Sequence, residues 1–379
     1  MSSEHHQKSV VVIGGGAIGV SSAVHLLRQG AQVTLVTEAA LGSGASGRSL
    51  SWLNSAGERA YEYHALRMAG IDRYRTLFAR HPHLNWLRFD GGLYWAADDD
   101  RGTRARHAGE KAQGYDSTLV SPQTIAEITP NVAPQAMADS AIFNAGEGWV
   151  SLPHLIGWLM EEFYQRGGKL LENAGKATVK TDAAGRACGV ITARLGELAA
   201  DAVLVACGPQ TPDVVAPLGV DIPNGSPVSM LVTTDPLASN LEVVMNTPRA
   251  AVRPNPGNTL AVDHDWYEEH IVSTGEGEYR IAETVVQALL DEASKLIVGE
   301  PALRASGWKI GLKPIPGDGN PVFGELKKVP GCFVAFTHSG ATLALIAGEL
   351  LAEEIVSGEP HPMFATFRAE RFTLPSAAR

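Results

Sequence analysis

The fold is decided by residues 9–49, which read SVVVIGGGAIGVSSAVHLLRQGAQVTLVTEAALGSGASGRS. The β-branched run at 10–13 is too short for a helix and predicts a buried strand. Gly14, Gly16 and Gly19 follow with the spacing G-x-G-x-x-G. Glycine at these positions permits a tight turn, lets the backbone approach a pyrophosphate and lets a helix pack closely on the strand.

A helix is predicted directly after the glycines, over residues 17–29, because its apolar residues recur at helical spacing. The amides of Ala17 and Ile18 have no acceptor inside that helix, and we expect them to face phosphates. Residues 32–36 then predict a second strand. Strand, glycines, helix and strand in this order indicate a Rossmann-like dinucleotide site.

Two features after the second strand bear on which dinucleotide binds. An acidic residue about 20 residues on would hold the adenosine ribose; by count that position is Thr37, and Glu38 is its neighbour. The small-residue loop at 41–48 can wrap a pyrophosphate from the other side through hydroxyls and backbone amides. Nicotinamide enzymes rarely have this loop, whereas many FAD enzymes do. The contacts predicted here are Ser43, Ala45, Ser46, Arg48, Ser49 and Leu50.

This segment resembles the N-terminus of the D-amino-acid oxidase-like (DAO) family of FAD-dependent oxidoreductases. Glycine oxidase, sarcosine oxidase and D-amino-acid dehydrogenases are members. The acid at Glu38 rather than Thr37 departs from the family pattern, so the residue that contacts the ribose stays open while the cofactor does not.

Three later segments extend the resemblance. Residues 147–153 are similar to the family's G-x-V-x-P step, where the chain returns to the FAD domain. Residues 201–209 are similar to its strand followed by A-x-G, and residues 332–343 to its closing strand, loop and helix. The further cofactor contacts that the resemblance implies are Val179, Ala206, Gly208, Gly311, Ser339, Gly340, Ala341, Thr342 and Leu343.

A fourth segment, residues 308–324, is similar to the family signature G-x-R-P then D-x-x-P-x-x-G, which crosses under the flavin. In amino-acid-oxidising members its arginine pairs with the substrate carboxylate, and here Lys313 takes that position. Lysine keeps the charge but cannot give a planar, two-pronged grip. Either the carboxylate is held as a point charge with help from Arg48 or Arg253, or the substrate is not a simple α-amino acid.

Other side chains are candidates for the substrate side of the site. Trp52 and Asn54 lie where the family's chain passes the flavin ring, with ordinary packing as the alternative. Arg253 and His264 lie on or beside predicted strands, where a charged residue is commonly just solvated. His338 either touches the ring or buttresses its turn.

The order of the segments predicts an α/β FAD-binding domain with a parallel central sheet, interleaved with an α+β substrate domain built on an antiparallel sheet. We expect the FAD-binding domain to comprise 8–55, 147–212 and 306–379, and the substrate domain 56–146 and 213–305. Within the substrate domain the pattern predicts helices over 61–80 and 279–298, a hairpin over 87–97, and strands at 228–234, 250–253 and 259–262.

Composition limits the partners and the compartment. The chain has 379 residues and a net charge of −10 with no basic stretch, which disfavours nucleic acid and anionic membranes. Its three cysteines are far apart, so neither disulfides nor a metal site are expected. The polar leader, residues 1–8, lacks the apolar region of a signal peptide, and no apolar run reaches the roughly 18 residues of a membrane span. We expect a cytoplasmic protein. Cys332 does not match the cysteine that tethers FAD in the sarcosine-oxidase branch, so FAD is expected to be non-covalent.

The resemblance implies oxidation of a C–N bond in an amino acid or secondary amine. The lone pair of a neutral amine would assist hydride departure to flavin N5, and the imine product would hydrolyse, so that no protein base is required. Oxygen or another acceptor would take the electrons. The alternatives are a dehydrogenase that reduces a quinone or partner protein, a nicotinamide-dependent dehydrogenase, and a non-catalytic flavoprotein subunit of a larger oxidase. Partner subunits or a homo-oligomer stay open.

Overall fold

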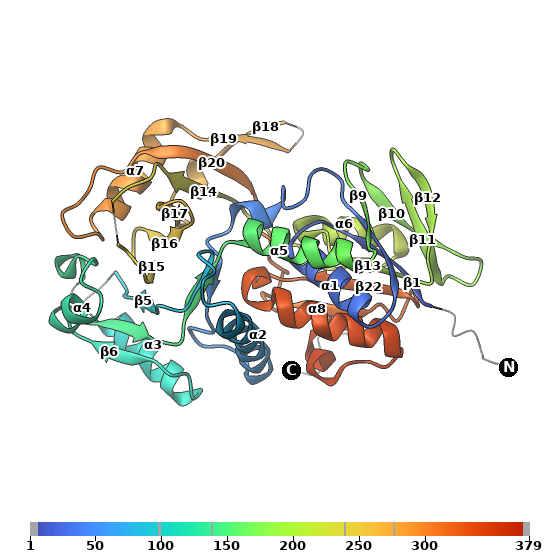
Figure 1. The fold of residues 1–379 in the computed structure, drawn as a ribbon, viewed down its shortest axis with the longest axis horizontal. Helices are drawn as coiled ribbons and strands as arrows, with labels where there is room; N and C mark the ends of the chain where they lie inside the picture. The colour runs from blue at the N-terminus through green and yellow to red at the C-terminus, as the bar shows by residue number, and fades with distance from the viewer. Residues whose placement is uncertain (1–6, 98–99, 138, 239, 276, 374–379) are drawn as a thin grey trace. The chain divides into compact units, whose positions relative to one another are not determined.

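The computed structural model describes residues 7–97, 100–137, 139–238, 240–275 and 277–373, so most of the polar leader lies outside the described residues (Figure 1). The chain divides into two compact units, each built from separate stretches. The first unit comprises Met1–Gly47, Leu152–Pro227 and Leu312–Arg379, and the second comprises Arg48–Ser151 and Val228–Gly311. These units are defined by packing alone, and the functional domain boundaries predicted above stay a prediction.

A six-stranded sheet forms the centre of the first unit. In spatial order its strands are β21 (Val322–Glu325), β22 (Cys332–Phe336), β13 (Ala202–Val205), β1 (Ser9–Ile13), β2 (Gln32–Val36) and β9 (Lys169–Leu171). All neighbouring strands pair in parallel except β21, which runs antiparallel to β22 at one edge. The predicted parallel central sheet is therefore confirmed, and five strands end at one carboxyl edge.

Alternate residues of this sheet face a second layer. Val11 and Ile13 of β1 share a hydrophobic cluster with Val179, Val190 and other buried residues. That layer is a three-stranded antiparallel sheet of β10 (Ala177–Thr181), β11 (Ala187–Thr192) and β12 (Gly196–Ala199), with α6 (Thr211–Val215) beside it. Strands β11 and β12 form a hairpin that turns at Gly196.

Three longer helices complete the first unit: α1 (Ala17–Arg28), α5 (Leu152–Gln165) and α8 (Gly340–Ser357). Helix α1 packs against both of the others (Figure 1). Where α1 meets α8, a Cβ atom built on Gly348 would stand 2.3 Å from Ser21 Oγ. The two helices therefore approach each other at backbone distance, which only glycine allows.

An eight-stranded sheet forms the second unit. In spatial order its strands are β20 (Ala305–Leu312), β14 (Val228–Thr234), β17 (Thr259–Asp263), β16 (Ala251–Asn255), β15 (Val244–Asn246), β5 (Gly92–Tyr94), β7 (Ala141–Asn144) and β6 (Thr118–Val120). Its described pairings are antiparallel apart from β15 with β5, as the sequence predicts for the substrate domain. Smaller pieces are a sheet of β3 (Trp52–Leu53), β8 (Gly148–Val150) and β4 (Leu87–Arg88), and a hairpin of β18 (Val272–Gly275) with β19 (Glu278–Arg280).

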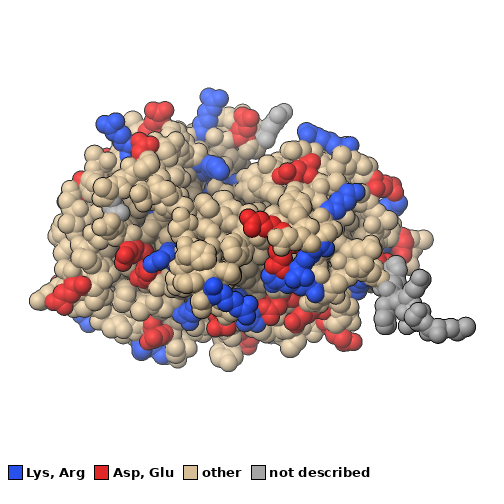
Figure 2. Space-filling model, in the orientation of Figure 1, with Lys and Arg blue, Asp and Glu red and all other residues tan. Residues whose placement is uncertain are grey.

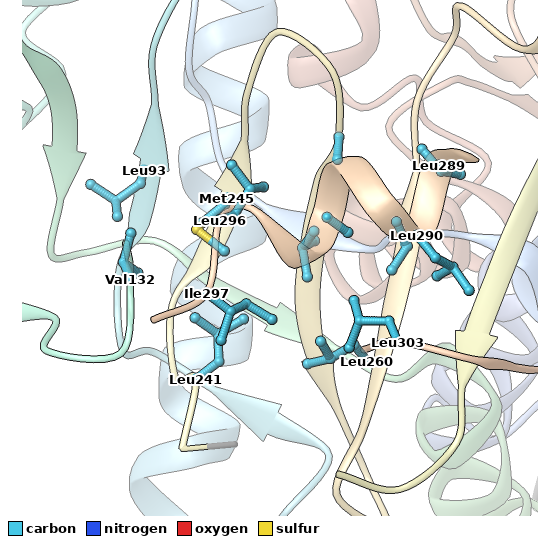
Figure 3. Close-up of a cluster of buried hydrophobic side chains, with 14 of the residues drawn as sticks. Leu93, Val132, Leu241, Met245, Leu260, Leu289, Leu290, Leu296, Ile297 and Leu303 are labelled. Atoms are coloured by element: carbon cyan, nitrogen blue, oxygen red, sulfur yellow. The ribbon is translucent and has the colours of Figure 1, made fainter. Parts of the chain in front are cut away.

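The core of the second unit lies between this sheet and helix α7 (Glu283–Ser294). Leu289 and Leu290 of α7 meet Met245 and Leu260 of the sheet in one buried cluster (Figure 3). The other helices of this unit are α2 (Tyr61–Arg80), α3 (Arg101–Ala112) and α4 (Pro122–Ile128). The predicted helix over 61–80 and strand over 228–234 match the structure.

One predicted element was wrong, and the bounds of another were too wide. Residues 87–97 do not form a hairpin, because β4 pairs with β8 while β5 pairs with β7 and β15 in another sheet. Gly91, with φ +98°, turns the chain between sheets rather than back on itself. The helix predicted over 279–298 is confined to Glu283–Ser294, because the residues before it form β19. Apolar spacing over so short a run fits a strand as well as a helix.

Two further features concern the charged surface of the molecule and the apolar character of its helices. On the face drawn in Figure 2, Lys and Arg side chains lie interspersed with Asp and Glu. Within the described ranges, the structure has no helix that is both long and apolar enough to cross a membrane.

We predict that Gly348→Ala destabilises the protein by about 1–3 kcal/mol, because the added methyl must enter a filled helix–helix contact. It would stand 2.8 Å from the backbone of Ser21 and Ser22. Equilibrium urea unfolding followed by circular dichroism measures the change. The matched control is Gly157→Ala at an exposed position of α5, where a Cβ meets nothing within 4 Å; it should stabilise by roughly 0.5–1 kcal/mol. Equal stability of the two variants would contradict the close crossing.

Candidate functional site

The glycine turn between β1 and α1 has no room for side chains. Gly14 has φ +119°, and a Cβ there would stand 2.1 Å from the carbonyl oxygen of Ala206. A Cβ on Gly19 would stand 1.9 Å from the carbonyl oxygen of Gly14. Steric exclusion of a side chain therefore explains why glycine stands at Gly14 and Gly19, two of the three glycines in the predicted motif. They hold β1, β13 and the first turn of α1 together at the carboxyl edge of the sheet.

The second loop closes over the N-terminus of α1. Gly16 is the N-cap and offers no side chain to the helix amides. The amide of Ala17 donates to Ser46 Oγ at 3.0 Å, and the amide of Gly42 donates to the carbonyl of Gly15 at 2.9 Å. The hydroxyl of Ser46, the amides at the start of α1 and the positive helix end thus gather in one place, which fits a pyrophosphate.

The two candidates for the ribose contact, Thr37 and Glu38, lie in different surroundings. Thr37 is buried, and its hydroxyl packs on Gly15, whose added Cβ would stand 3.0 Å from it. Glu38 is exposed at the end of β2. Burial, reinforced by the charge of Glu38, raises the pKa of Cys207 at the end of β13 to about 12. The carboxylate of Glu38 is therefore accessible and lies close enough to the carboxyl edge to act on Cys207.

A second helix begins at the same edge. Ser339 is the N-cap of α8, its amide donates to Thr337 Oγ1 at 3.1 Å, and its carbonyl accepts from the amide of Leu343 at 2.9 Å. A Cβ on Gly340 would stand 3.9 Å from Ile18 Cδ1 in α1. The positive ends of α1 and α8 therefore lie next to each other. His338, just before the cap, is exposed.

The remaining cofactor candidates of the first unit lie in different surroundings. Ala206 donates its amide to the carbonyl of Ile13 at 2.8 Å, and Gly208 follows with φ +57°. Val179 is buried in the cluster under the sheet. Lys313 is half-buried, and its amide donates to the carbonyl of Pro227 at 2.8 Å.

Arg253 is the most unusual charged residue of the second unit. It is 3% exposed on β16, and burial lowers its pKa to about 9. Its Nε–H donates to the carbonyl of Leu50, and Nη1 donates to the carbonyl of Pro254 at 2.8 Å and to Asn255 Oδ1 at 2.9 Å. Every one of these acceptors is neutral. Within the described residues, no carboxylate pairs with the guanidinium and no acceptor meets Nη2.

A second donor without an acceptor lies beside this guanidinium. Arg253 Cζ stands 5.2 Å from the ring centre of Trp149, a cation–π contact. The indole N–H of Trp149 is buried, and the described residues give it no acceptor. Because buried donors are normally satisfied, this indole N–H fits a ligand oxygen, and the guanidinium beside it, which has no carboxylate partner among the described residues, fits an anionic one.

The chain that leads to Leu50 is also tightly held. The guanidinium of Arg48 packs on Gly311, where a Cβ would stand 2.5 Å from its Cζ, and burial lowers the pKa of Arg48. Ser51 has φ +57°, an uncommon conformation for a residue with a side chain. Its amide donates to Ser49 Oγ at 3.1 Å. The structure thus brings Arg48 to Gly311 and Leu50 to Arg253.

His264 takes no part in this group. Its Nε2 lies 3.1 Å from the carbonyl oxygen of Thr247, and its Nδ1 lies 2.7 Å from Asp265 Oδ1. Both ring nitrogens therefore have partners near the surface of the second unit. Among the described residues there is also no cluster of side chains that could hold a metal ion.

The sequence analysis missed a buried acid. Glu147 is 2% exposed, and its oxygens accept from Trp52 Nε1–H at 2.7 Å and from the hydroxyl of Tyr115 at 2.6 Å. An acidic residue directly before an apolar strand was the available signal. The partners lie 95 and 32 residues away in the chain, and no sequence pattern connects them.

Comparisons with known proteins agree with this geometry. The chain is 25% identical to a glycine oxidase of Pseudomonas aeruginosa, over 93% of this chain and 95% of that protein. It is 27% identical to a D-amino acid dehydrogenase of Methylobacterium radiotolerans, over 92% and 96%. The crystal structure of glycine oxidase from Geobacillus kaustophilus superposes with a TM-score of 0.82 at 21% identity, covering 97% of this chain and 99% of that one. The predicted fold class is confirmed.

A family description also matches, that of FAD dependent oxidoreductases (DAO), over residues 9–354. This match begins in the strand before the glycine turn and ends inside the helix whose N-terminus lies beside α1. The chain belongs to the DAO family of FAD-dependent oxidoreductases.

Proposed function

We propose that the protein oxidises the C–N bond of an amino acid that carries a free carboxylate. FAD held in this site would supply the oxidant, taking up a hydride from the α-carbon, and the imine product would then hydrolyse in water. The observation that carries the proposal is Arg253, a buried cation whose protein acceptors are all neutral. Burying an unpaired charge is costly, and a substrate carboxylate offsets that cost.

Most of the residues that hold the cofactor in this proposal belong to the first unit. The amides of Ala17 and Ile18 and the hydroxyl of Ser46 bind the pyrophosphate, and Glu38 binds the ribose. The N-terminus of α8 stabilises the negative charge that develops on the flavin ring during reduction. The further contacts that we propose are Gly14, Gly16, Gly19, Ser43, Ala45, Arg48, Ser49, Leu50, Val179, Ala206, Gly208, Gly311, Ser339, Gly340, Ala341, Thr342 and Leu343.

FAD is held without a covalent bond in this proposal. Cys332 is fully buried in β22, and burial raises the pKa of its thiol to about 12. Cys207 has a similarly raised pKa. A thiol so protected is a poor nucleophile. All three cysteines are free, which also supports a cytoplasmic location, where thiols stay reduced.

The substrate side of the site orients rather than transfers protons. Arg253 binds the carboxylate, Trp149 supports the guanidinium, and Lys313 adds a positive charge. Trp52 packs against the reacting molecules, and His338 buttresses the turn before α8. The substrate amine must be neutral for its lone pair to assist hydride departure, so positioning supplies much of the rate.

Oxygen is the electron acceptor that we propose, on the strength of the similarity to a protein named glycine oxidase. The similarity to a protein named D-amino acid dehydrogenase favours the second candidate, transfer to a quinone or a partner protein. A non-catalytic flavoprotein subunit is the third candidate.

The experiment that tests the function is anaerobic titration of the purified protein with a panel of amino acids and amines. We expect flavin absorption bands that bleach with an amino acid and return with air, together with oxygen uptake. Acid precipitation should leave FAD in solution. Bleaching without oxygen uptake would favour the dehydrogenase, and bands that never bleach would favour the non-catalytic subunit. A protein that stays colourless with added FAD would overturn the assignment.

We predict that Glu38→Ala raises the dissociation constant of FAD about 10- to 100-fold, because hydrogen bonds to a carboxylate contribute roughly 1.5–3 kcal/mol. Quenching of FAD fluorescence by apoprotein measures binding. Glu197→Ala is the control, since this carboxylate lies exposed on β12 and pairs with Lys180. An unchanged dissociation constant in Glu38→Ala would remove Glu38 from the ribose site.

We predict that Arg253→Met raises the apparent dissociation constant of the amino-acid substrate about 10- to 100-fold, because a charge-assisted contact is lost. The rate of anaerobic flavin reduction against substrate concentration measures it. The variant should also lose the preference of the wild type for the amino acid over its amide. Arg249→Met is the control, because this exposed arginine also stacks on a tryptophan, Trp266, at 4.4 Å. Wild-type discrimination in Arg253→Met would disprove the assigned role.

A further inference from the structure

The second unit contains a buried carboxyl group that the proposed chemistry does not use. Glu147 lies directly before β8, and its side chain is nearly inaccessible. No cation among the described residues forms an ion pair with it, and its oxygens meet two neutral donors instead. Replacing buried ionic groups with apolar ones is often neutral or stabilising, so stability alone gives little reason for an acid here.

The contacts of this carboxyl hold one short segment of the chain at both ends. Oε2 accepts from the indole N–H of Trp52 at 2.7 Å, and Oε1 accepts from the hydroxyl of Tyr115 at 2.6 Å. The Tyr115 hydroxyl in turn accepts from the amide of Ser55 at 2.9 Å. Within residues 52–55, Trp52 thus bonds to Glu147 directly, and Ser55 is connected to Glu147 through Tyr115.

The surroundings leave this network little freedom. A Cβ on Gly92 would stand 2.0 Å from Glu147 Oε2, so the carboxyl lies directly on the backbone of β5. His64 of α2 bonds to Ser55 Oγ at 2.8 Å through Nδ1, and its ring meets that of Tyr115 edge-on, at 5.6 Å between centres. A shift of the indole would therefore break bonds on several elements.

We propose that Glu147 is a positioning residue that acts on the reaction through the indole of Trp52. The inference rests on the proposed function, in which Trp52 packs against the reacting molecules. Trp52 is only half-buried, so part of its ring is accessible. Its N–H is held by the hydrogen bond to the buried carboxyl of Glu147. The hydrogen bond sets the angle of the ring, and the carboxyl itself touches neither substrate nor cofactor.

The protonation state of Glu147 determines the strength of its hydrogen bond to the indole of Trp52. Burial raises its pKa to about 8, and the nearby charge of Glu110 on α3 adds to the rise. The bonds from Tyr115 and Trp52 and the charge of Arg106 on α3 act in the opposite direction.

The α2 side of the network also carries titratable groups. His64 contacts Tyr115, and Arg67 acts on Tyr115 through its charge. Below pH 8 the acid can donate to the tyrosine hydroxyl, and above it the ionised carboxylate accepts from both partners. The bond to the indole then becomes charge-assisted and stronger.

The first test observes the indole without substrate or turnover. In protein labelled with ¹⁵N at tryptophan, the signal that disappears in Trp52→Phe identifies the Trp52 N–H. We expect this signal to move downfield as pH rises through about 8. Glu147→Gln should abolish the movement, whereas Glu110→Gln should retain it. Glu110 is a matched control, because it is equally buried but bonds to Arg106 and the amide of Gly57. A Trp52 signal that moves equally in Glu147→Gln would overturn the proposal.

The second test is a double-mutant cycle on anaerobic flavin reduction. We expect Glu147→Gln to slow reduction about tenfold and Trp52→Phe to do the same, because small misplacements near the reacting atoms are costly. The double variant should be no slower than Trp52→Phe, since the carboxyl has nothing left to position. Losses that multiply, or an equal loss in Glu110→Gln, would overturn the inference while the wild type's bleaching still supports the proposed function.

A further variant covers the case in which Glu147→Gln does not fold. Tyr115→Phe removes one donor and leaves the contact between Glu147 and Trp52 in place. Loss of that donor should raise the pH at which the Trp52 signal moves, because a hydrogen bond that favours the ionised acid is gone. An unchanged midpoint in Tyr115→Phe would contradict the network.

Discussion

The first unit depends on one steric constraint, the approach of three backbones at the carboxyl edge of its sheet. Gly14 touches the carbonyl of Ala206, and Gly19 touches the carbonyl of Gly14. Because no side chain fits at either position, β1, β13 and α1 are held at fixed distances from one another. At this point β1 has a paired strand on each side. In open parallel sheets ligands bind at such an edge. The second loop and the N-terminus of α8 are then placed against an already fixed turn.

The second unit is organised by charge rather than by glycine. It buries a cation, Arg253, whose acceptors are neutral, and an acid, Glu147, whose donors are neutral. Each is expensive to bury, and neither neutralises the other through a described contact. Among the described contacts Arg253 meets no carboxylate and Glu147 meets no cation, and two such unpaired groups are compatible with a protein that binds a charged ligand. In our proposals the two residues have different roles, since Arg253 binds the substrate and Glu147 orients a neighbouring side chain.

The sequence predicted those parts of the protein in which local sterics determine structure. The β1–α1–β2 unit and β14 follow from residue spacing, because glycine and alternating apolar residues act within a few positions. The hairpin at 87–97 failed because a turn signal does not say which strands pair. Arg253 was a candidate, but its burial depends on Leu50, some two hundred positions away. Glu147 was overlooked for the same reason.

The interleaving of the two units has a consequence for biosynthesis. The strand at the centre of the first sheet, β1, is made first, yet β22 and α8 emerge more than three hundred residues later. An N-terminal fragment therefore exposes strand edges that have no neighbours, and such edges promote aggregation. The sheet of the first unit must therefore stay incomplete, or its exposed strand edges must be shielded by other proteins, until almost all of the chain has left the ribosome. A premature stop before β22 would remove both a strand of the first unit's sheet and helix α8.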